Sequence, residues 1–149
     1  MAQTYIGSTL RTGSDTLTDS VDGGFVVVSQ TTTVTTAAAG TATSASVTLP
    51  ASSQIINFFV DMVQDEVVGG GTATAIAMTI GTAAAGTQYV SSTNIFTGGR
   101  AALTFTAAQL AAMANIGTNQ SVFITVDPNG TISTTQAIVR LTVVYAQKV

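Results

Sequence analysis

Two runs of alternating apolar residues, separated by a polar and glycine-rich stretch, limit most strongly what this chain can fold into. The first run spans residues 55–63 (IINFFVDMV), and the second repeats the pattern at Thr74, Ile76, Met78 and Ile80. Successive side chains of a β-strand point to opposite faces, so each run predicts a strand with one face in a core. In the first strand the more apolar set is expected inside, namely Ile56, Phe58, Val60 and Met62. A lone strand pair is not stable in water, so other segments must supply further strands.

Further strands are predicted along the rest of the chain. Strand patterns cover residues 25–34, 41–49, 122–126 and 138–145, and residues 101–105 could be extended. Shorter strand candidates, 88–90 and 94–96, lie on either side of a Ser-Ser-Thr turn. The last long strand is expected to bury one face, which carries Val139, Leu141, Val143 and Tyr145.

One helix is predicted among these strands. Thr106 and Gln109 have the spacing of a capping box, in which each side chain satisfies a backbone N–H at the start of a helix. The helix is expected over residues 106–115, with Leu110 and Met113 in the core and Gly117 as its stop. Many short strands and one short helix in a connection predict an all-β fold, a β-sandwich that is jelly-roll-like.

The chain divides into an N-terminal segment, residues 1–24, and a single β-sandwich domain, residues 25–149. The segment is polar and turn-rich, and its apolar residues are isolated points. It is either a loosely packed lead-in strand or an arm that docks on a neighbouring subunit. In the second case the candidate subunit contacts are Tyr5, Ile6 and Leu10.

Charged side chains make up only 7% of the chain, and the net charge is −3. With four cations and no basic patch, a nucleic-acid partner is not expected. A surface so poor in charge resists self-association weakly, which favours a protein that is partly covered by partners. No apolar run is long enough to span a membrane, and the N-terminus lacks the pattern of a signal peptide, so no membrane partner is expected.

The absence of His and Cys removes the commonest general base, the commonest zinc ligands and the thiol nucleophile. Asp61 with Asp65 or Glu66 could form the carboxylate pair of a glycosidase. We favour a structural interpretation over this pair: Asp61 is a charge at a strand end, and Asp65 and Glu66 are hydrated acids in a loop. The chain has no Trp, the residue that would serve as a platform for a sugar ring. No catalytic residue and no cofactor are expected.

A second acidic group, Asp15, Asp19 and Asp22, precedes Gly23 and Gly24. Carboxylate oxygens are calcium ligands, but the spacing does not match the alternating acidic pattern of a calcium loop. We therefore interpret the three aspartates as residues of ordinary hydrated turns, and no metal site is expected.

Four segments carry a resemblance to a known class of proteins. They are LPASSQIINFFVDMVQ, GGGTATAIAMTIGT, TAAQLAAMANIG and AIVRLTVVYAQ, which together lie between residues 47 and 147. In this order they resemble small bacteriophage head proteins of the cement or decoration type. The resemblance implies a β-sandwich module on the outside of an icosahedral capsid, where it bridges neighbouring major capsid subunits. It implies no catalytic residues.

The first functional hypothesis is therefore a structural virion protein that stabilises the capsid surface and is assembled in the host cytoplasm. Its expected partners are the major capsid protein and further copies of itself, as a trimer or dimer. The alternative is a glycan-binding β-sandwich module of a tail fibre or adhesin, and a carboxylate glycosidase is the third class. A glycan binder is expected to expose aromatic side chains in a cleft, and an enzyme requires two carboxylates facing each other.

Overall fold

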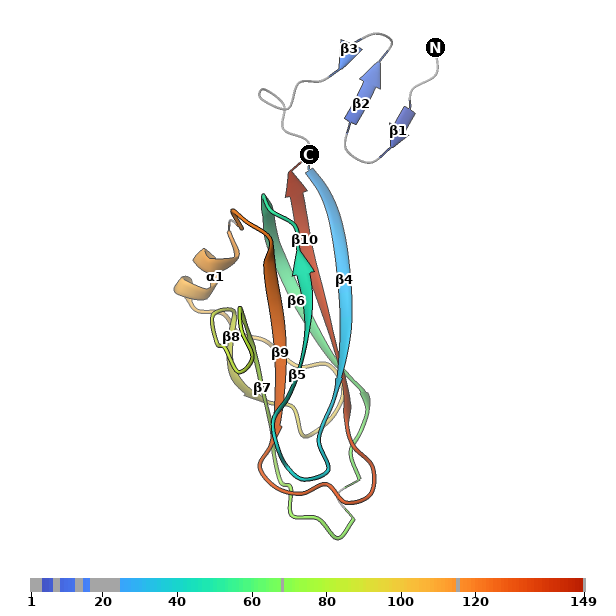
Figure 1. The fold of residues 1–149 in the computed structure, drawn as a ribbon, viewed down its shortest axis with the longest axis vertical. Helices are drawn as coiled ribbons and strands as arrows, with labels where there is room; N and C mark the ends of the chain where they lie inside the picture. Colours follow the sequence, from blue (N-terminus) through green and yellow to red (C-terminus); the bar gives the residue numbers. More distant parts are fainter. Residues whose placement is uncertain are drawn as a thin grey trace.

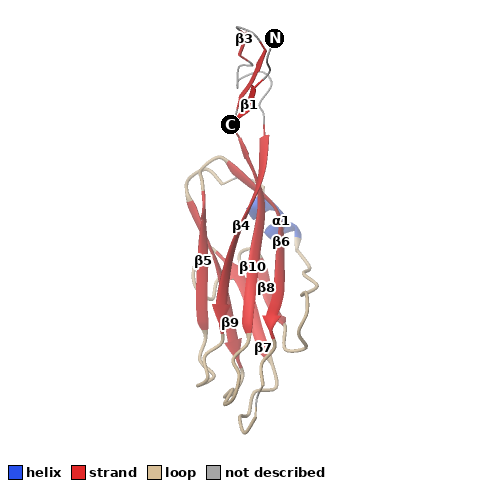
Figure 2. Ribbon diagram, turned by 90° about the vertical axis from the view of Figure 1, so that its right-hand side faces the viewer, coloured by secondary structure: helices blue, strands red, loops and turns tan. Residues whose placement is uncertain are grey.

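Two antiparallel sheets pack face to face as a β-sandwich (Figures 1 and 2), as predicted. The computed structural model describes residues 4–6, 9–12, 15–16, 25–67, 69–114 and 116–148. One sheet has the order β4 (Phe25–Thr35), β10 (Ile138–Lys148) and β6 (Ser53–Gln64). The other has the order β5 (Thr43–Leu49), β9 (Gln120–Pro128), β7 (Ile76–Gly81) and β8 (Val90–Asn94).

The connections between these strands follow a jelly roll. In chain order β4, β5, β6 and β7 alternate between the two sheets, and β9 and β10 later insert between strands already present in each sheet. Residues 99–101 run along the outer edge of β6, where Met62 N donates to Gly99 O at 2.8 Å and Ala101 N donates to Val60 O at 2.9 Å. This segment occupies the place of a fourth strand in the first sheet. The result is the Greek-key arrangement of a jelly roll.

The core lies between the two sheets and is formed by alternate residues of each strand. On β10 the predicted inward face is confirmed, since Val139, Leu141, Val143 and Tyr145 are all buried. Side chains of β7 and β9 face them from the other sheet, and Ile76, Met78, Ile80, Val122, Ile124 and Val126 are fully buried. Burial of this much aliphatic surface is the main favourable contribution to folding.

The predicted core face of β6 is wrong at one position. Val144 of β10 is opposite Asn57, and the next residue, Tyr145, is opposite Ile55, so Ile56 is an extra residue in the ladder. Such a β-bulge interrupts the alternation of faces. Ile55 is therefore buried at 3% exposure and Ile56 is 50% exposed, whereas Phe58 and Val60 are buried as predicted and Met62 is half-buried.

The two strands that dominate the sequence do not pair with each other. β6 and β7 lie in opposite sheets and contribute to the core from opposite sides. Their predicted assignment as strands is confirmed, but their neighbours are β10 and β9, which come much later in the chain.

The region 88–105 differs from the expectation. The Ser-Ser-Thr sequence predicted as a turn lies inside the single strand β8. β8 pairs with β7, and the Asn94 side chain at its end accepts hydrogen bonds from the backbone N–H of Ile76 and of Phe96. Apart from the backbone bond of Ala101 N to Val60 O, residues 101–105 form a loop and not the predicted extended segment.

Helix α1 (Ala107–Met113) begins as predicted and ends early. The Thr106 side chain accepts from Gln109 N, and the Gln109 side chain accepts from Thr106 N, so both bonds of the capping box are present. The helix ends at Met113, before the expected stop at Gly117. Gln109 and Met113 are its buried residues, whereas Leu110 is exposed, which contradicts the prediction of Leu110 as a core residue.

The N-terminal segment forms a small sheet of its own. Strands β1 (Thr4–Ile6), β2 (Thr9–Thr12) and β3 (Asp15–Thr16) are antiparallel neighbours in that order. Figures 1 and 2 place this sheet beyond the end of the sandwich at which β4 begins and β10 ends. The division of the chain at residue 24 stays a prediction.

Candidate functional site

The three predicted subunit contacts lie on the paired strands β1 and β2. Tyr5 is directly opposite Leu10, and Ile6 is opposite Thr9. The backbone thus brings the isolated apolar residues of the sequence onto neighbouring strands. Their role in a contact between subunits stays a prediction.

No metal site is found in the part of the chain that the structure describes, where no group of three or more His, Cys, Asp or Glu is placed to hold an ion. Of the acidic group weighed as a calcium site, Asp15 lies in β3, and Asp19 and Asp22 lie outside the described residues. Among the described helices none is long and apolar enough to cross a membrane.

A cluster of charges lies on the outer face of the β4–β10–β6 sheet. Asp61 on β6 accepts a hydrogen bond from Arg100 Nε at 2.7 Å and a second from Arg140 Nη2 at 3.3 Å. The Arg100 guanidinium also lies 5.1 Å from the centre of the Phe59 ring, within the range of a cation–π contact. Sequence reasoning missed this cluster, because its members are 39 and 79 residues from Asp61.

The cluster makes Asp61 a poor catalytic acid. The hydrogen bond from Arg100 is the largest influence and lowers the pKa of the Asp61 carboxyl below its usual value, while burial opposes it and Arg140 assists. A glycosidase acid needs a raised pKa so that it is protonated at neutral pH. Asp61 is instead held ionised, and both of its oxygens already accept hydrogen bonds. Through these bonds Asp61 links β6 to two segments that are distant in the sequence, those of Arg100 and Arg140.

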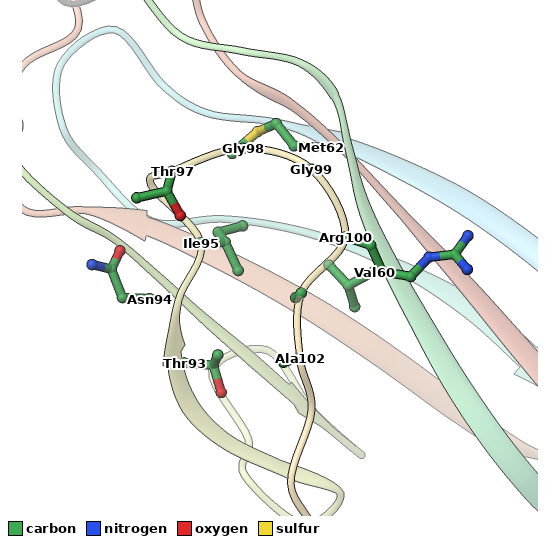
Figure 3. Close-up of a pocket in the computed structure, with 11 residues that line it drawn as sticks. Val60, Met62, Thr93, Asn94, Ile95, Thr97, Gly98, Gly99, Arg100 and Ala102 are labelled. Carbon is green, nitrogen blue, oxygen red and sulfur yellow. The ribbon is translucent and has the colours of Figure 1, made fainter.

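A pocket of about 300 Å³ lies beside this cluster, between β6 and the loop that follows β8 (Figure 3). Val60, Met62, Ile95 and Ala101 supply its apolar lining, with Thr93 and Thr97 among the polar residues. Figure 3 shows the charged end of Arg100 pointing away from the pocket, towards β6.

Among the described residues, no carboxylate side chain lines the pocket. The side-chain oxygen of Asn94 accepts from the backbone N–H groups of Ile76 and Phe96. The lining of the pocket mixes apolar and polar side chains.

Comparison with known proteins identifies a related fold in a virus particle. No protein-family model matches the chain, and no curated protein matches it in sequence. Among solved structures, a chain of the cyanophage Pam1 capsid asymmetric unit is similar, with a TM-score of 0.56 and 23% sequence identity. The match covers 85% of this chain and 87% of that chain. At this level of identity the likeness shows a shared fold.

Proposed function

We propose that this protein is a structural component of a bacteriophage virion that binds the outside of the icosahedral capsid and stabilises it by bridging major capsid subunits. In this role it is a cement or decoration protein, it acts as a homo-oligomer, and it has no enzymatic activity. It joins the particle during assembly in the host cytoplasm.

The observation that carries the proposal is the likeness to a chain of a phage capsid, which extends over 85% of the protein. The match covers nearly the whole of both chains, so it concerns the complete module and not one common hairpin. The four sequence segments that resemble phage head proteins contribute β6, β7, α1 and β10 to this same module.

The outer surface of the sandwich supports the same role. The exposed outward positions of β4 include Ser29, Thr31, Thr33 and Thr35, and none of them is charged. Hydroxyl side chains cost less to remove from water than charged ones, provided that they form hydrogen bonds across the interface. Such a surface suits a protein that covers seams between subunits, because the stabilisation that it gives the capsid depends on well-packed buried area.

The proposal is tested by fractionation of virus particles. Purified particles are separated on a density gradient, and the ratio of this protein to the major capsid protein is measured by quantitative mass spectrometry. We expect a fixed ratio of one or a few copies of this protein per capsomer. Particles that lack the protein are expected to rupture at a lower temperature. Absence from intact heads overturns the proposal.

The same gradient separates the alternative of a tail-fibre or adhesin module. Heads and tails are purified separately from mutants blocked in joining. A capsid protein is found with heads, whereas recovery with tails at a few copies per particle contradicts a capsid role and supports the glycan-binding alternative.

A further inference from the structure

We infer that β4 is a self-pairing edge, and that two copies of this protein join through antiparallel β4–β4 pairing into one continuous sheet. The inference concerns the contact between copies and does not depend on capsid binding. It rests on the direction of the backbone groups of β4, on the uncharged composition of this strand, and on the shorter length or the coverage of the other sheet edges.

The backbone groups of alternate β4 residues point away from the molecule. Thr36 N donates to Ala137 O at 3.0 Å, so even-numbered residues bond towards β10. The Thr35 carbonyl points the other way, since it accepts from the Thr43 hydroxyl at 2.7 Å. Because the N–H and C=O of one strand residue share a side and alternate along the strand, the groups of four residues face the open edge: Val27, Ser29, Thr31 and Thr33. Within the described residues these groups have no partner.

Among the residues that the structure describes, the edge of β4 shows none of the devices that normally prevent pairing. Its sequence, FVVVSQTTTVT, contains no charge, no proline and no glycine, and its 11 residues pair with β10 without a bulge. Val27 is 63% exposed. Proteins usually protect edge strands with charges, prolines, bulges or a covering segment, because a long uncharged edge recruits further strands. An edge left in this state is expected to be covered in the functional assembly.

The other sheet edges are less suited to this role. The outer edge of β6 is already covered by residues 99–101. β8 has 5 residues and β5 has 7, against 11 in β4. Only β4, among the described edges, offers a long and regular ladder.

A second copy of the chain is the partner that fits this edge. Antiparallel pairing of identical strands is symmetric, and a two-fold axis near Thr31 places Ser29 of one copy opposite Thr33 of the other. The outward side chains that face each other across the two β4 strands are then all hydroxyl or aliphatic side chains. Cross-strand pairs of Thr and Ser are favourable. The charged residues described on this outer face lie on β10 (Arg140), on β6 (Asp61) and beyond β6 (Arg100), so none of them is on β4 and no like charges meet at the seam.

The first test measures self-association by sedimentation-velocity ultracentrifugation over a range of protein concentrations. The parent protein is expected to form dimers. Ser29→Lys and Thr31→Lys place a charge on the open edge and are expected to weaken the dimer by about tenfold or more. The matched control is Ser92→Lys, which adds the same charge at an exposed position of β8, the far edge strand of the other sheet, and leaves the dimer within about twofold of the parent. Melting curves show that each variant is folded.

The second test uses the absence of native cysteine. Ser29→Cys and Thr31→Cys are oxidised separately and as a mixture. Directly opposed residues of an antiparallel pair have Cα atoms about 4.5–5.5 Å apart, which a disulfide can bridge. A covalent dimer in at least one of the three samples, and none with Ser92→Cys, supports the inference. A parent protein that stays monomeric, lysine variants that dimerise like the parent, or no specific cross-link in any sample would each overturn it.

Discussion

Asp61 accepts a 2.7 Å hydrogen bond from Arg100 Nε, and this bond fastens the segment before α1 to the edge of β6. The backbone bonds of Gly99 and Ala101 to β6 lie on either side of it. The ion pair therefore acts together with a short length of sheet edge, and Arg140 joins it from the neighbouring strand β10.

Replacement of Asp61 by Asn is expected to remove a pH-dependent part of the stability. Arg100 and Arg140 lower the pKa of the folded carboxyl, so its contribution is present above the unfolded pKa of about 3.9 and is lost as pH falls through the lower folded value. Thermal melts at pH 6 and at pH 2 measure this. The variant should melt below the parent at pH 6, and the two should converge at pH 2. A constant difference at both pH values contradicts the assignment, and Asp65→Asn controls for the loss of one negative charge.

Replacement of Gln109 by Leu is expected to cost more stability than loss of the helix cap alone. The Gln109 side chain is 6% exposed, and it accepts from Thr106 N and donates to Ser91 Oγ of β8 and to Thr87 O. Leucine keeps the volume but removes all three hydrogen bonds, each with a net contribution of about 1 kcal/mol, so the expected cost is about 2–3 kcal/mol. Thr106→Ala removes only the cap, at about 1 kcal/mol. Urea unfolding of both variants measures the difference, and equal costs show that the link to β8 contributes nothing.

Three glycine-to-alanine variants separate backbone strain from steric clash. Gly40 has φ of +71°, and a Cβ there would lie 2.5 Å from the Gly130 carbonyl oxygen, so Gly40→Ala is expected to cost about 3 kcal/mol or more. Gly99 has φ of +76° with open space around it, so Gly99→Ala is expected to cost about 1 kcal/mol from strain alone. Gly117 has neither constraint, so Gly117→Ala leaves stability unchanged or raises it by up to about 1 kcal/mol. Any other order in urea unfolding contradicts these local geometries.

Deletion of residues 2–12 is expected to leave the melting temperature of the sandwich nearly unchanged while it weakens assembly or particle binding. The deletion removes β1 and β2, which pair with each other and carry Tyr5, Ile6 and Leu10. Calorimetry and co-sedimentation with particles measure the two effects. A truncated protein that unfolds shows that the segment is part of the core. Normal assembly and binding by the truncated protein show that the contact lies elsewhere.

The fold was predictable where a local pattern has one physical cause. The alternation Val139, Leu141, Val143, Tyr145 has no other explanation than a strand with one buried face, and it is confirmed. The spacing of Thr106 and Gln109 likewise specified the start of α1. Ile56 was placed wrongly, because a bulge depends on the register against β10, which is far away in the chain.

Long-range features left no local signal. Nothing near Asp61 in the sequence indicates that it pairs with Arg100 and Arg140, since each of the three lies on a segment with its own pattern. Hydroxyl residues favour turns, so the Ser-Ser-Thr sequence of β8 predicts a turn. In the structure, pairing with β7 overrides that local preference. The assignment of β6 and β7 to opposite sheets also required the positions of β9 and β10.

The central position of β10 has a consequence for the order of events during synthesis. In their sheet β4 has no hydrogen-bonded partner, and β6 has only the short segment 99–101, until β10 inserts between them. β10 emerges from the ribosome after every other described strand. The ladder between β4 and β10 joins residues more than a hundred positions apart, such as Val34 and Val139, and contacts of such long sequence separation form slowly. Nascent chains thus cannot present a finished β4–β10–β6 sheet to one another, and pairing through β4 is postponed until the last strand has been translated.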